Sequence, residues 1–371
     1  MKENIRILSL PVDQGGCGWY RIRQPFQMIN NFTNNEAHVV DDNVDSGVEI
    51  LKALWLADVL VIRQGGEVGL YELKKALLDY SREINKPYHF PKVVLDIDDN
   101  IELISPYSQH YEDYGVNDFF DKKLDKWLWK DKESFDVHKN RNKVMSLMRG
   151  LREVDLVTVT TNKLAEYARQ FNPNVAVLPN CIDSQKWWKL PFKENEQLRV
   201  GWSGGVSHYE DWYSIKEPLN RLLRKYRFKL ISVGAHFEGV IDEDLRDLVE
   251  VWPWVPFEAH SYRMMCMNLD IAIIPLANSE FNQNKSSIKF YEMSSMGVPS
   301  VVSDVLPYSQ DITTDNSMPY SSPTEFEYAL ERLIKDKTHR RLLSRNSLKW
   351  VTEKDAKNNV SLWVDAYKQL L

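Results

Sequence analysis

The sequence predicts an α/β protein made of two doubly wound domains of parallel strands that face each other across a cleft. Short apolar runs rich in β-branched residues alternate with amphipathic segments along most of the chain, the pattern of repeated strand–helix–strand units. Polar loops, several with glycine, follow these runs. At 371 residues the chain is also longer than one compact core usually supports. Because ligands bind at the carboxyl ends of such strands, we expect the site in the cleft between the domains.

The first half of the chain carries the elements of one such domain. An apolar run at 5–10 predicts a strand, a loop with Gly15, Gly16 and Gly18 follows, and a helix is expected at 20–32. The other strands of this domain are expected at 37–40, 59–63, 92–95, 156–160 and 175–178. Its other helices are expected at 48–54, 70–84 and 162–170, the last capped by Thr161. The opening is typical of a dinucleotide-binding domain, although a tight turn is the simpler explanation of a lone glycine pattern.

Residues 101–150 interrupt this alternation and give no strand signal, so a helical insertion is expected there. Between 122 and 143, lysine and arginine side chains are interleaved with Trp127, Trp129 and Phe135. One interpretation is a solvated amphipathic helical hairpin. The other is a cover over the cleft that grips an acceptor. Lysines beside aromatic rings would suit an anionic acceptor such as a nucleic-acid strand.

The alternation resumes after a polar linker at 184–197. A strand is expected at 198–202, followed by a loop that contains Gly204 and Gly205. Further strands are expected at 229–233, 249–251, 271–275 and 300–302. Helices are expected at 213–226, 243–248, 261–268, 285–296, 325–335 and 339–348. The tail at 356–371 has apolar residues at helical spacing, which predicts a helix that docks on the rest of the protein.

The stretch 270–304 gives the most specific indication of a site. It predicts a buried strand, a polar loop, a helix that Gly297 ends, and a second strand. A helix start offers free N–H groups and a partial positive charge of about half a unit, which suits a phosphate. Lys285 and Lys289 are expected on the first turn, and Glu292 one turn later could accept hydrogen bonds from ribose hydroxyls. The competing interpretation is a surface helix with solvated lysines.

Acidic residues follow the strand at 92–95. Asp98 and Asp99 are expected to face the cleft, where a positioned carboxylate can act as a general base. Capping of the next helix is the alternative. Asp96, Asp98 and Asp99 would together suit a hard metal ion, but lysines beside a diphosphate make a metal unnecessary and none is expected. Arg63 ends a neighbouring strand and is a candidate for phosphate or acceptor contact.

Composition narrows the class of protein. The chain is 43% apolar and 27% charged, as ordinary globular proteins are. Its formal net charge of -6 does not indicate a nucleic-acid binder, although it is compatible with a local basic face. The three cysteines are far apart and odd in number, which indicates neither a disulfide framework nor a metal site. The sequence shows no signal peptide and no apolar run of membrane-spanning length, so a cytoplasmic protein is expected.

Several segments resemble the GT-B glycosyltransferases. Residues 177–183, VLPNCID, resemble their interdomain connection, and residues 200–205, VGWSGG, resemble the strand and glycine loop that open their second domain. Residues 285–302 resemble the donor-binding segment of the retaining family-four branch, and the closing helix resembles the one that crosses back onto the first domain. The resemblance covers nearly the whole chain in order. Phage and bacterial surface-glycan members are the most similar, on the evidence of residues 18–22 and 96–99.

The resemblance implies a GT-B fold and a particular division of the chain. Residues 1–183 would form the acceptor-side domain and 184–197 the linker. Residues 198–350 would form the nucleotide-sugar-binding domain, and 351–371 a helix that packs back on the first domain.

The resemblance also implies roles for individual residues. Glu292 matches the second glutamate of the family's paired-glutamate motif and would bind ribose, whereas Asn284 stands where the first glutamate would, so the contact with the donor sugar differs. Lys285, or the amides of Ser286 and Ser287, would hold phosphate. Other donor contacts are expected at Gly15, Gly16, Gly18, Gly204, Gly205, His208, Lys289, Trp254 and Val255. The acceptor side is expected at Tyr20, Arg21, Arg63, Trp127 and Trp129.

The implied function is transfer of a sugar from a nucleotide-diphosphate sugar, such as a UDP-sugar, to a hydroxyl, with retention and without a cofactor. The acceptor would be a surface glycan, a lipid-linked sugar or a hydroxymethylated base in phage DNA. In the retaining branch the leaving phosphate takes the acceptor's proton. One alternative is a nucleotide-sugar epimerase on the same fold, which would consume donor without an acceptor. The other is a binding module without turnover, which Asn284 keeps open.

Overall fold

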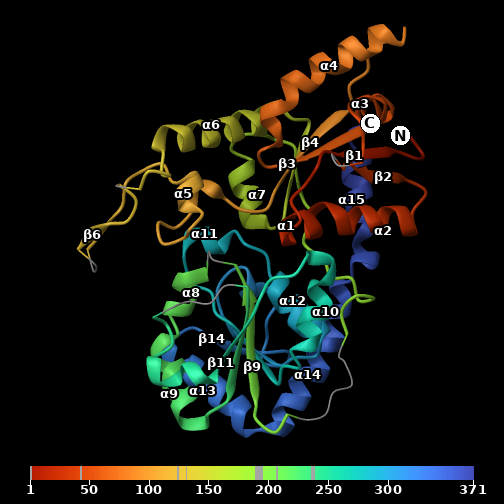
Figure 1. Ribbon diagram of the computed structural model, residues 1–371. Helices are drawn as coiled ribbons and strands as arrows, with labels where there is room; N and C mark the ends of the chain where they lie inside the picture. The colour runs from red at the N-terminus through yellow and green to blue at the C-terminus, as the bar shows by residue number, and fades with distance from the viewer. Residues whose placement is uncertain are drawn as a thin grey trace.

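The computed structural model describes residues 2–41, 44–122, 125–130, 132–188, 195–205, 208–234 and 239–371. Two parallel sheets form two lobes, one above the other in Figure 1. Within the described residues each sheet has six strands, in the orders β2-β1-β3-β4-β7-β8 and β11-β10-β9-β12-β13-β14. Both orders are those of doubly wound sheets, so the predicted fold class is confirmed. Part of the expected linker, residues 189–194, lies outside the described residues.

The first sheet and its helices run from the start of the chain to residue 177. Its strands are β1 (Arg6–Ser9), β2 (Glu36–Val39), β3 (Val59–Arg63), β4 (Lys92–Ile97), β7 (Leu156–Val159) and β8 (Val175–Val177). Its helices are α1 (Gly16–Gly18), α2 (Gln24–Phe32), α3 (Gly47–Leu56), α4 (Leu70–Glu83), α5 (Tyr111–Tyr114), α6 (Val137–Glu153) and α7 (Asn162–Ala168).

The second sheet follows the linker. Its strands are β9 (Arg199–Gly204), β10 (Lys229–Gly234), β11 (Val249–Trp252), β12 (Ile271–Ile274), β13 (Ser300–Ser303) and β14 (Met318–Tyr320). The helices of this part of the chain are α8 (Tyr209–Tyr213), α9 (Lys216–Tyr226), α10 (His260–Cys266), α11 (Glu280–Gln283), α12 (Ile288–Ser295), α13 (Pro323–Lys335) and α14 (Lys337–Val351). The last helix of the chain is α15 (Ala356–Lys368).

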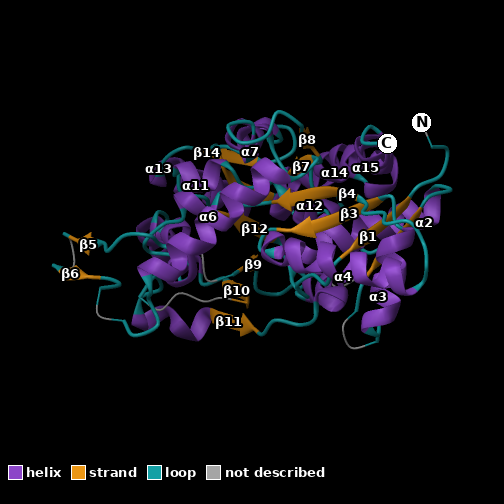
Figure 2. Ribbon diagram, turned by 90° about the horizontal axis from the view of Figure 1, so that it is seen from above, coloured by secondary structure: helices purple, strands orange, loops and turns teal. Residues whose placement is uncertain are grey.

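Each sheet is buried on both faces because successive side chains of a strand point to opposite sides. In β3, Leu60 and Ile62 pack with the apolar side chains of α3, α4, α6 and α7. Val59 and Val61 pack on the other face with those of α2 and α15. Figure 2 shows helices on both sides of the strands. This double burial explains why the strands are continuous apolar runs rather than alternating ones.

Local sequence signals fix several helix ends. The Thr161 hydroxyl accepts from the Leu164 amide at the start of α7, as predicted. At the other end of a helix, Gly297 follows α12 with a φ of 63°, a left-handed conformation that favours glycine. The helix itself begins later than predicted, at Ile288, with Ser287 at its N-cap position. Lys285 therefore lies before the helix rather than on its first turn, where only Lys289 of the two lysines is found.

The helix expected at 20–32 is divided. A π-helical turn, Trp19–Arg23, precedes α2, and the amide of Gln24 donates to the carbonyl of Trp19. Pro25 stands at the start of α2 and has no N–H to donate to the preceding turn, so a regular α-helix cannot continue through this point. Such single π turns are frequent at functional sites.

The prediction of a helical hairpin at 122–143 is wrong. The segment begins with a short antiparallel ladder, in which β5 (Phe120–Asp121) pairs with β6 (Lys126–Trp127). Asp125, in the turn, has a φ of 48°, a conformation that aspartate tolerates better than most residues. Cross-strand packing of the Phe120 and Trp127 rings, with centroids 5.4 Å apart, adds to the ladder. Helix α6 begins only at Val137.

The last helix returns to the first lobe, as expected. Trp363 and Tyr367 of α15 are buried with Ile22, Phe26 and Ile29, and Figure 1 shows α15 beside α2. The returning chain passes the end of the first domain, where a parallel bridge pairs Ile182 with Asp355. Among the described residues, no helix combines the length and the apolar character that crossing a bilayer requires.

Candidate functional site

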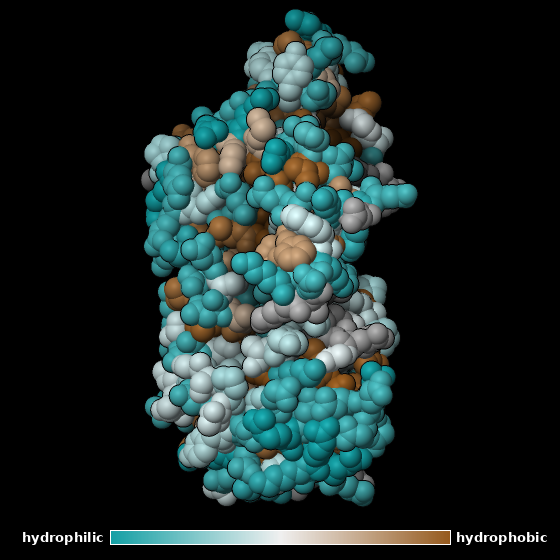
Figure 3. All heavy atoms as spheres, turned by 90° about the vertical axis from the view of Figure 1, so that its left-hand side faces the viewer, coloured by the Kyte–Doolittle hydropathy of each residue, from teal (hydrophilic) through white to brown (hydrophobic). Residues whose placement is uncertain are grey.

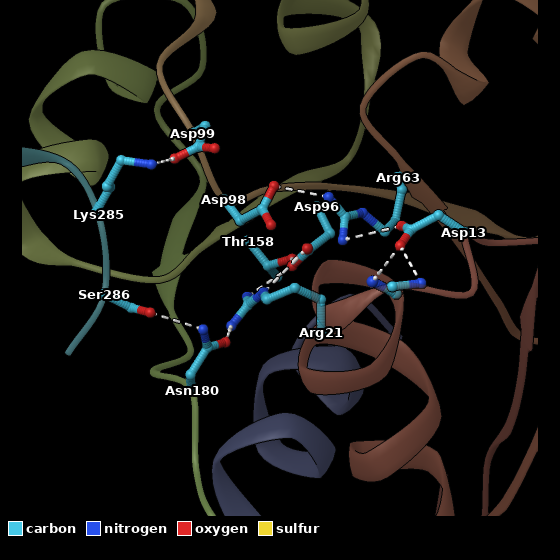
Figure 4. Close-up of polar contacts among 12 residues, drawn as sticks. Asp13, Arg21, Arg63, Asp96, Asp98, Asp99, Thr158, Asn180, Lys285 and Ser286 are labelled. Atoms are coloured by element: carbon cyan, nitrogen blue, oxygen red, sulfur yellow. Dashed lines mark hydrogen bonds and ion pairs between the residues drawn. The ribbon is translucent and has the colours of Figure 1, made fainter. Parts of the chain in front are cut away.

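The carboxyl ends of the two sheets face each other, and the loop between α11 and α12 contacts the first domain there. The Asn180 side-chain amide donates to the Ser286 hydroxyl over 2.9 Å, and Lys285 Nζ lies 3.8 Å from Asp99 Oδ1 (Figure 4). Strand order reverses beside β9 in one sheet and beside β1 in the other, the points at which such sheets bind ligands. Figure 3 shows an indented outline between the two lobes.

A lysine, a histidine and an aspartate are linked beside the glycine loop that ends β9. Lys289 Nζ lies 2.7 Å from His208 Nε2, and His208 Nδ1 lies 2.5 Å from Asp211 Oδ2. An ammonium has no lone pair, so His208 Nε2 accepts from Lys289 and Nδ1–H donates to Asp211. Lys289 Nζ also lies 4.9 Å from the centre of the Trp202 ring. A Cβ atom at Gly204 would lie 2.4 Å from that ring and 2.6 Å from Lys289 Nζ, so only glycine fits here.

The charges of this group follow from its surroundings. Burial and the neighbouring Lys289 lower the pKa of His208 to about 4, against the opposing effect of Asp211, so the imidazole is neutral. Burial, followed by the charge of Lys285, lowers the pKa of Lys289 to about 7. Asp211 is held in turn by the amide of Ala277, over 2.7 Å. Lys289 is therefore held in a fixed position, and its surroundings lower the fraction of its amine that is protonated.

Lys289 has no carboxylate partner within ion-pair distance among the described residues. A partly buried cation without a counter-ion is costly, and an anionic ligand would remove that cost. The start of α12, with its free amide groups, lies beside it. Lys285 is differently placed: its ammonium lies 4.5 Å from the Phe281 ring centre, as well as near Asp99.

The side-chain amide and the backbone carbonyl of Asn284 are both hydrogen-bonded to protein groups. Its side-chain amide donates to the Glu280 carbonyl over 2.7 Å, and its backbone carbonyl accepts from the Thr161 hydroxyl over 3.2 Å. Its side-chain oxygen is buried without a hydrogen-bond partner. The Ser286 hydroxyl accepts a hydrogen bond from the Asn180 side-chain amide, and Ser287 is buried at the start of α12.

Glu292 lies inside the contact between the domains. Its Oε1 atom accepts from the Tyr20 hydroxyl over 2.7 Å and lies 3.8 Å from His260 Nε2. The sequence placed Tyr20 on the acceptor side, and the structure places its hydroxyl on the glutamate expected to bind ribose.

Aromatic side chains surround this carboxylate. The Phe257 ring stacks on His260 with centroids 4.7 Å apart, and the Tyr20 ring meets Phe257 edge-on. Trp254 is half exposed, and a Cβ at Gly234 would lie 2.5 Å from its ring. Val255 is partly buried next to it in sequence. Apart from Tyr20 and Gly234, which ends β10, these residues follow the carboxyl end of β11.

The first domain contributes an arginine and two carboxylates to the opposite wall. Arg63 donates to Asp98 Oδ1 over 2.7 Å, while its second terminal nitrogen, 3.8 Å from Asp13 Oδ2, is buried without a hydrogen bond. Burial alone would raise the pKa of Asp98, but Arg63, a hydrogen bond from Cys17 and the charges of Arg21 and Lys285 together outweigh burial, and the pKa is lowered. Burial and the charge of Asp98 raise the pKa of Asp99, although Lys285, 3.8 Å away, opposes them.

Arg21 and Asp96 belong to the interior of the first domain rather than to the cleft. Arg21 is 1% exposed and binds Asp96 with two nitrogens, over 3.1 and 2.7 Å, and Thr158 donates to the same carboxylate. A further guanidinium nitrogen donates to the side-chain oxygen of Asn180 (Figure 4). This corrects the expectation that Arg21 faces the acceptor. Asp96 is likewise unavailable to a metal, and in the part of the chain described no three acidic, histidine or cysteine side chains are grouped to hold one.

The glycines of the first loop serve local packing. Asp13 Oδ1 accepts from the amides of Gly15 and Gly18, over 2.9 and 3.2 Å. A Cβ at Gly18 would lie 2.1 Å from the Asp13 carbonyl, and one at Gly16 would lie 3.2 Å from the Phe257 ring. Two of the three amides expected to approach the donor are therefore already bonded.

The two tryptophans expected near the acceptor differ in environment. Trp129 is 5% exposed and donates its indole N–H to the Pro106 carbonyl over 2.7 Å, so its ring belongs to a small core. This corrects its assignment to an acceptor surface. Trp127 is 45% exposed, and β6, which carries it, projects away from both lobes in Figure 1.

Sequence reasoning missed three residues of this arrangement. Asp211 orients His208. Phe257 and His260 had no assigned role. The only sequence signal for Phe257 was the high density of aromatic residues at 252–257. His260 gave no signal, because a histidine on an amphipathic helix is most often a core residue.

Comparison with known proteins supports the fold and extends no further at this level of identity. No protein-family model matches the chain, and no curated protein sequence matches it. Solved structures do. Sucrose-phosphate synthase from Thermosynechococcus elongatus is 12% identical with a TM-score of 0.59, and the match covers 99% of each chain. HepE of Anabaena, solved with UDP and glucose, is 11% identical with a TM-score of 0.60, over 98% of this chain and 100% of HepE. The lipopolysaccharide outer core galactosyltransferase WaaB is 13% identical with a TM-score of 0.51, over 99% and 100%. The chain therefore has the GT-B fold.

Proposed function

We propose that this protein is a glycosyltransferase that moves a sugar from a nucleotide-diphosphate donor to a hydroxyl acceptor. The observation that carries the proposal is the ammonium of Lys289, which has no carboxylate partner in the described chain and lies between the Gly204 loop and the start of α12. A diphosphate placed there would meet a cation, free helix amides and a loop without side chains. HepE, a structural neighbour, was solved with UDP, which supports a UDP-sugar as donor.

The chemistry needs few protein groups. The bond from the anomeric carbon to the diphosphate oxygen breaks, and a bond from that carbon to the acceptor oxygen forms. Negative charge gathers on the leaving diphosphate, where Lys289, Lys285 and the α12 amides would stabilise it. Removal of one such fixed donor typically costs about 2.7–4 kcal/mol in the barrier. No metal is required for this charge balance, and no cofactor takes part.

The acceptor's proton has two possible destinations. We propose that it passes to the leaving diphosphate, with retention of configuration, because Asp98 is bound to Arg63 and is a weak base. Asp99 is the carboxylate that an inverting reaction would use, because its pKa is raised and its side chain is 36% exposed. The configuration of the product, read by NMR, distinguishes the two.

The acceptor-facing wall favours a neutral, hydroxyl-rich acceptor. Asp13, Asp98 and Asp99 provide three carboxylates there, against one guanidinium from Arg63 and the ammonium of Lys285 across the cleft. A polyanion such as phage DNA would be repelled by the excess of carboxylates. A glycan or lipid-linked sugar is the acceptor class that this wall supports.

The test measures nucleoside diphosphate release from a panel of nucleotide sugars, with and without saccharide acceptors. Lys289→Ala should lower turnover by roughly 10²–10³-fold. Lys349→Ala, which removes an exposed lysine of α14, is the matched control and should leave turnover unchanged. Donor consumption that no acceptor accelerates would indicate an epimerase. Silence with every donor, with tight nucleotide binding, would indicate a binding module. Absence of both binding and turnover would contradict the proposal.

A further inference from the structure

We infer that Tyr20, a residue of the first domain, is a positioning residue of the donor site: its hydroxyl fixes Glu292 so that the second carboxylate oxygen can accept the donor's ribose hydroxyls. The inference rests on the proposed function, because it requires a nucleotide in the cleft. It adds to that function a residue from the opposite lobe, and with it a dependence of donor affinity on contact between the lobes.

The hydrogen bond itself is well defined. Tyr20 is 3% exposed and Glu292 is 4% exposed, and their hydroxyl and Oε1 atoms are 2.7 Å apart. A buried carboxylate requires hydrogen bonds, and the other polar group near this oxygen is His260 Nε2, at 3.8 Å. Tyr20 is therefore the main anchor of the carboxylate.

The glutamate keeps one oxygen for a ligand. Within the described chain, no hydrogen bond reaches Glu292 Oε2, whereas Oε1 accepts from Tyr20. An ionised carboxylate has acceptor sites on both oxygens. Glu292, which carries the free oxygen, lies one turn after Lys289 on α12. A ribose attached to a diphosphate at Lys289 would meet it.

Tyr20 is held rigidly enough to act as an anchor. Its ring meets the Phe257 ring edge-on, with centroids 5.3 Å apart at 79°. Its backbone lies in the π-helical turn Trp19–Arg23, which follows directly after α1 (Gly16–Gly18). A Cβ at Gly16 would lie 3.2 Å from the Phe257 ring, so the two segments are closely packed. Burial and the charge of Glu292 raise the pKa of Tyr20 well above its ordinary value, so the hydroxyl remains a donor at every working pH.

A competing role predicts the opposite result. If the Tyr20 hydroxyl occupied the place of the ribose, its removal would free Glu292 and tighten nucleotide binding. If it positions Glu292, its removal weakens binding and, in particular, removes the preference for a hydroxylated ribose. A purely structural tyrosine would alter the binding of all nucleotides to the same extent.

The experiment compares nucleotides that differ only in the ribose. Calorimetry measures Kd for UDP, GDP, ADP and CDP and for the 2′,3′-dideoxy form of the tightest of them, with wild type, Tyr20→Phe and Glu292→Gln. Wild type should prefer the hydroxylated form by about 10-fold or more, the usual size of a hydrogen bond to a charged group. Both variants should bind the hydroxylated form about 10-fold more weakly and lose that preference, while the dideoxy form binds as before.

Tyr291→Phe is the matched control. Tyr291 is a buried tyrosine on the same helix, and its hydroxyl donates to the carboxylate of Asp311 over 2.8 Å. It should retain the ribose preference. Equal binding of both forms by wild type, a retained preference in Tyr20→Phe, or tighter binding by that variant would each overturn the inference and leave the proposed function intact. Failure of wild type to bind any of the four nucleotides would overturn both.

Discussion

At the scale of single residues, the site depends on one lysine whose charge is weakened by its surroundings. The charge of the neighbouring Lys285 contributes to the lowered pKa of Lys289. The Lys289 ammonium donates a hydrogen bond to the neutral imidazole of His208 rather than to a carboxylate. Its pKa of about 7 places it close to half protonation under ordinary conditions. A diphosphate would restore the full charge, because it supplies the counter-ion that the folded chain does not.

This arrangement predicts that donor binding depends on pH. Burial lowers the pKa of Lys289 to about 7 in the free protein, and a bound diphosphate raises it. Binding therefore takes up a proton, and affinity should be constant below pH 7, when both states are protonated, and fall as pH rises above 7. Calorimetry of UDP between pH 7 and 9, in buffers of different ionisation enthalpy, measures the uptake. Lys289→Arg should bind without this pH dependence. Equal slopes for the two proteins would contradict the assignment.

The sequence identified some of these residues for the right reason and others only by resemblance. Lys289 and Glu292 were found because strand, loop and helix follow one another in 270–304. Tyr20, Phe257 and His260 were not connected to them, because a contact between residues 272 positions apart leaves no pattern in either segment. Arg21 was assigned to the acceptor side because the sequence does not distinguish a solvated arginine from one that is buried in an ion pair with an aspartate.

At the scale of elements, the parallel strands were predictable and the insertion was not. Double burial makes each strand a continuous apolar run, which the sequence shows directly. In residues 101–150 the aromatic side chains form a small core together with Phe281 of the second domain, and the elements are short and irregular. Its ladder has two residues in each strand, too few for a periodicity to be recognised.

The two tryptophans of this insertion should respond differently to truncation. Trp129→Ala should destabilise the protein by about 3–5 kcal/mol, because it removes a buried ring from a core. Trp127→Ala, with the ring exposed on β6, should change the free energy of unfolding little. Urea unfolding followed by circular dichroism measures both. If Trp127 contacts an acceptor, its variant should raise the acceptor KM at unchanged stability. Similar losses of stability for both variants would contradict the placement of the rings.

At the scale of the whole molecule, the end of the chain stabilises its beginning. Trp363 and Tyr367 of α15 complete the apolar face on which β1, α2 and β3 lie, although Trp363 comes 300 residues after Arg63, the last residue of β3. Lys368 also donates to the Glu3 carbonyl. The first domain is thus built from both ends of the chain.

Trp363→Ala should therefore destabilise the first domain. The expected loss is about 3–5 kcal/mol, because the side chain is 1% exposed and its removal leaves a cavity. Limited proteolysis should then cleave first within residues 1–177, ahead of the second domain. Leu362→Ala, whose side chain is 41% exposed on the same helix, is the control and should behave as wild type. First cleavage inside the second domain would show that α15 does not support the first.

The bridge between Ile182 and Asp355 has a mechanical consequence. The chain crosses between the lobes twice, and the two crossings are tied together there by backbone hydrogen bonds, from Ile182 to Lys354 over 2.9 Å and from Ala356 to Ile182 over 2.8 Å. They form a single double-stranded pivot. The lobes can rotate about this connection. They cannot slide past each other without breaking both hydrogen bonds. An opening of the cleft that preserves these two bonds is then a rotation about this connection.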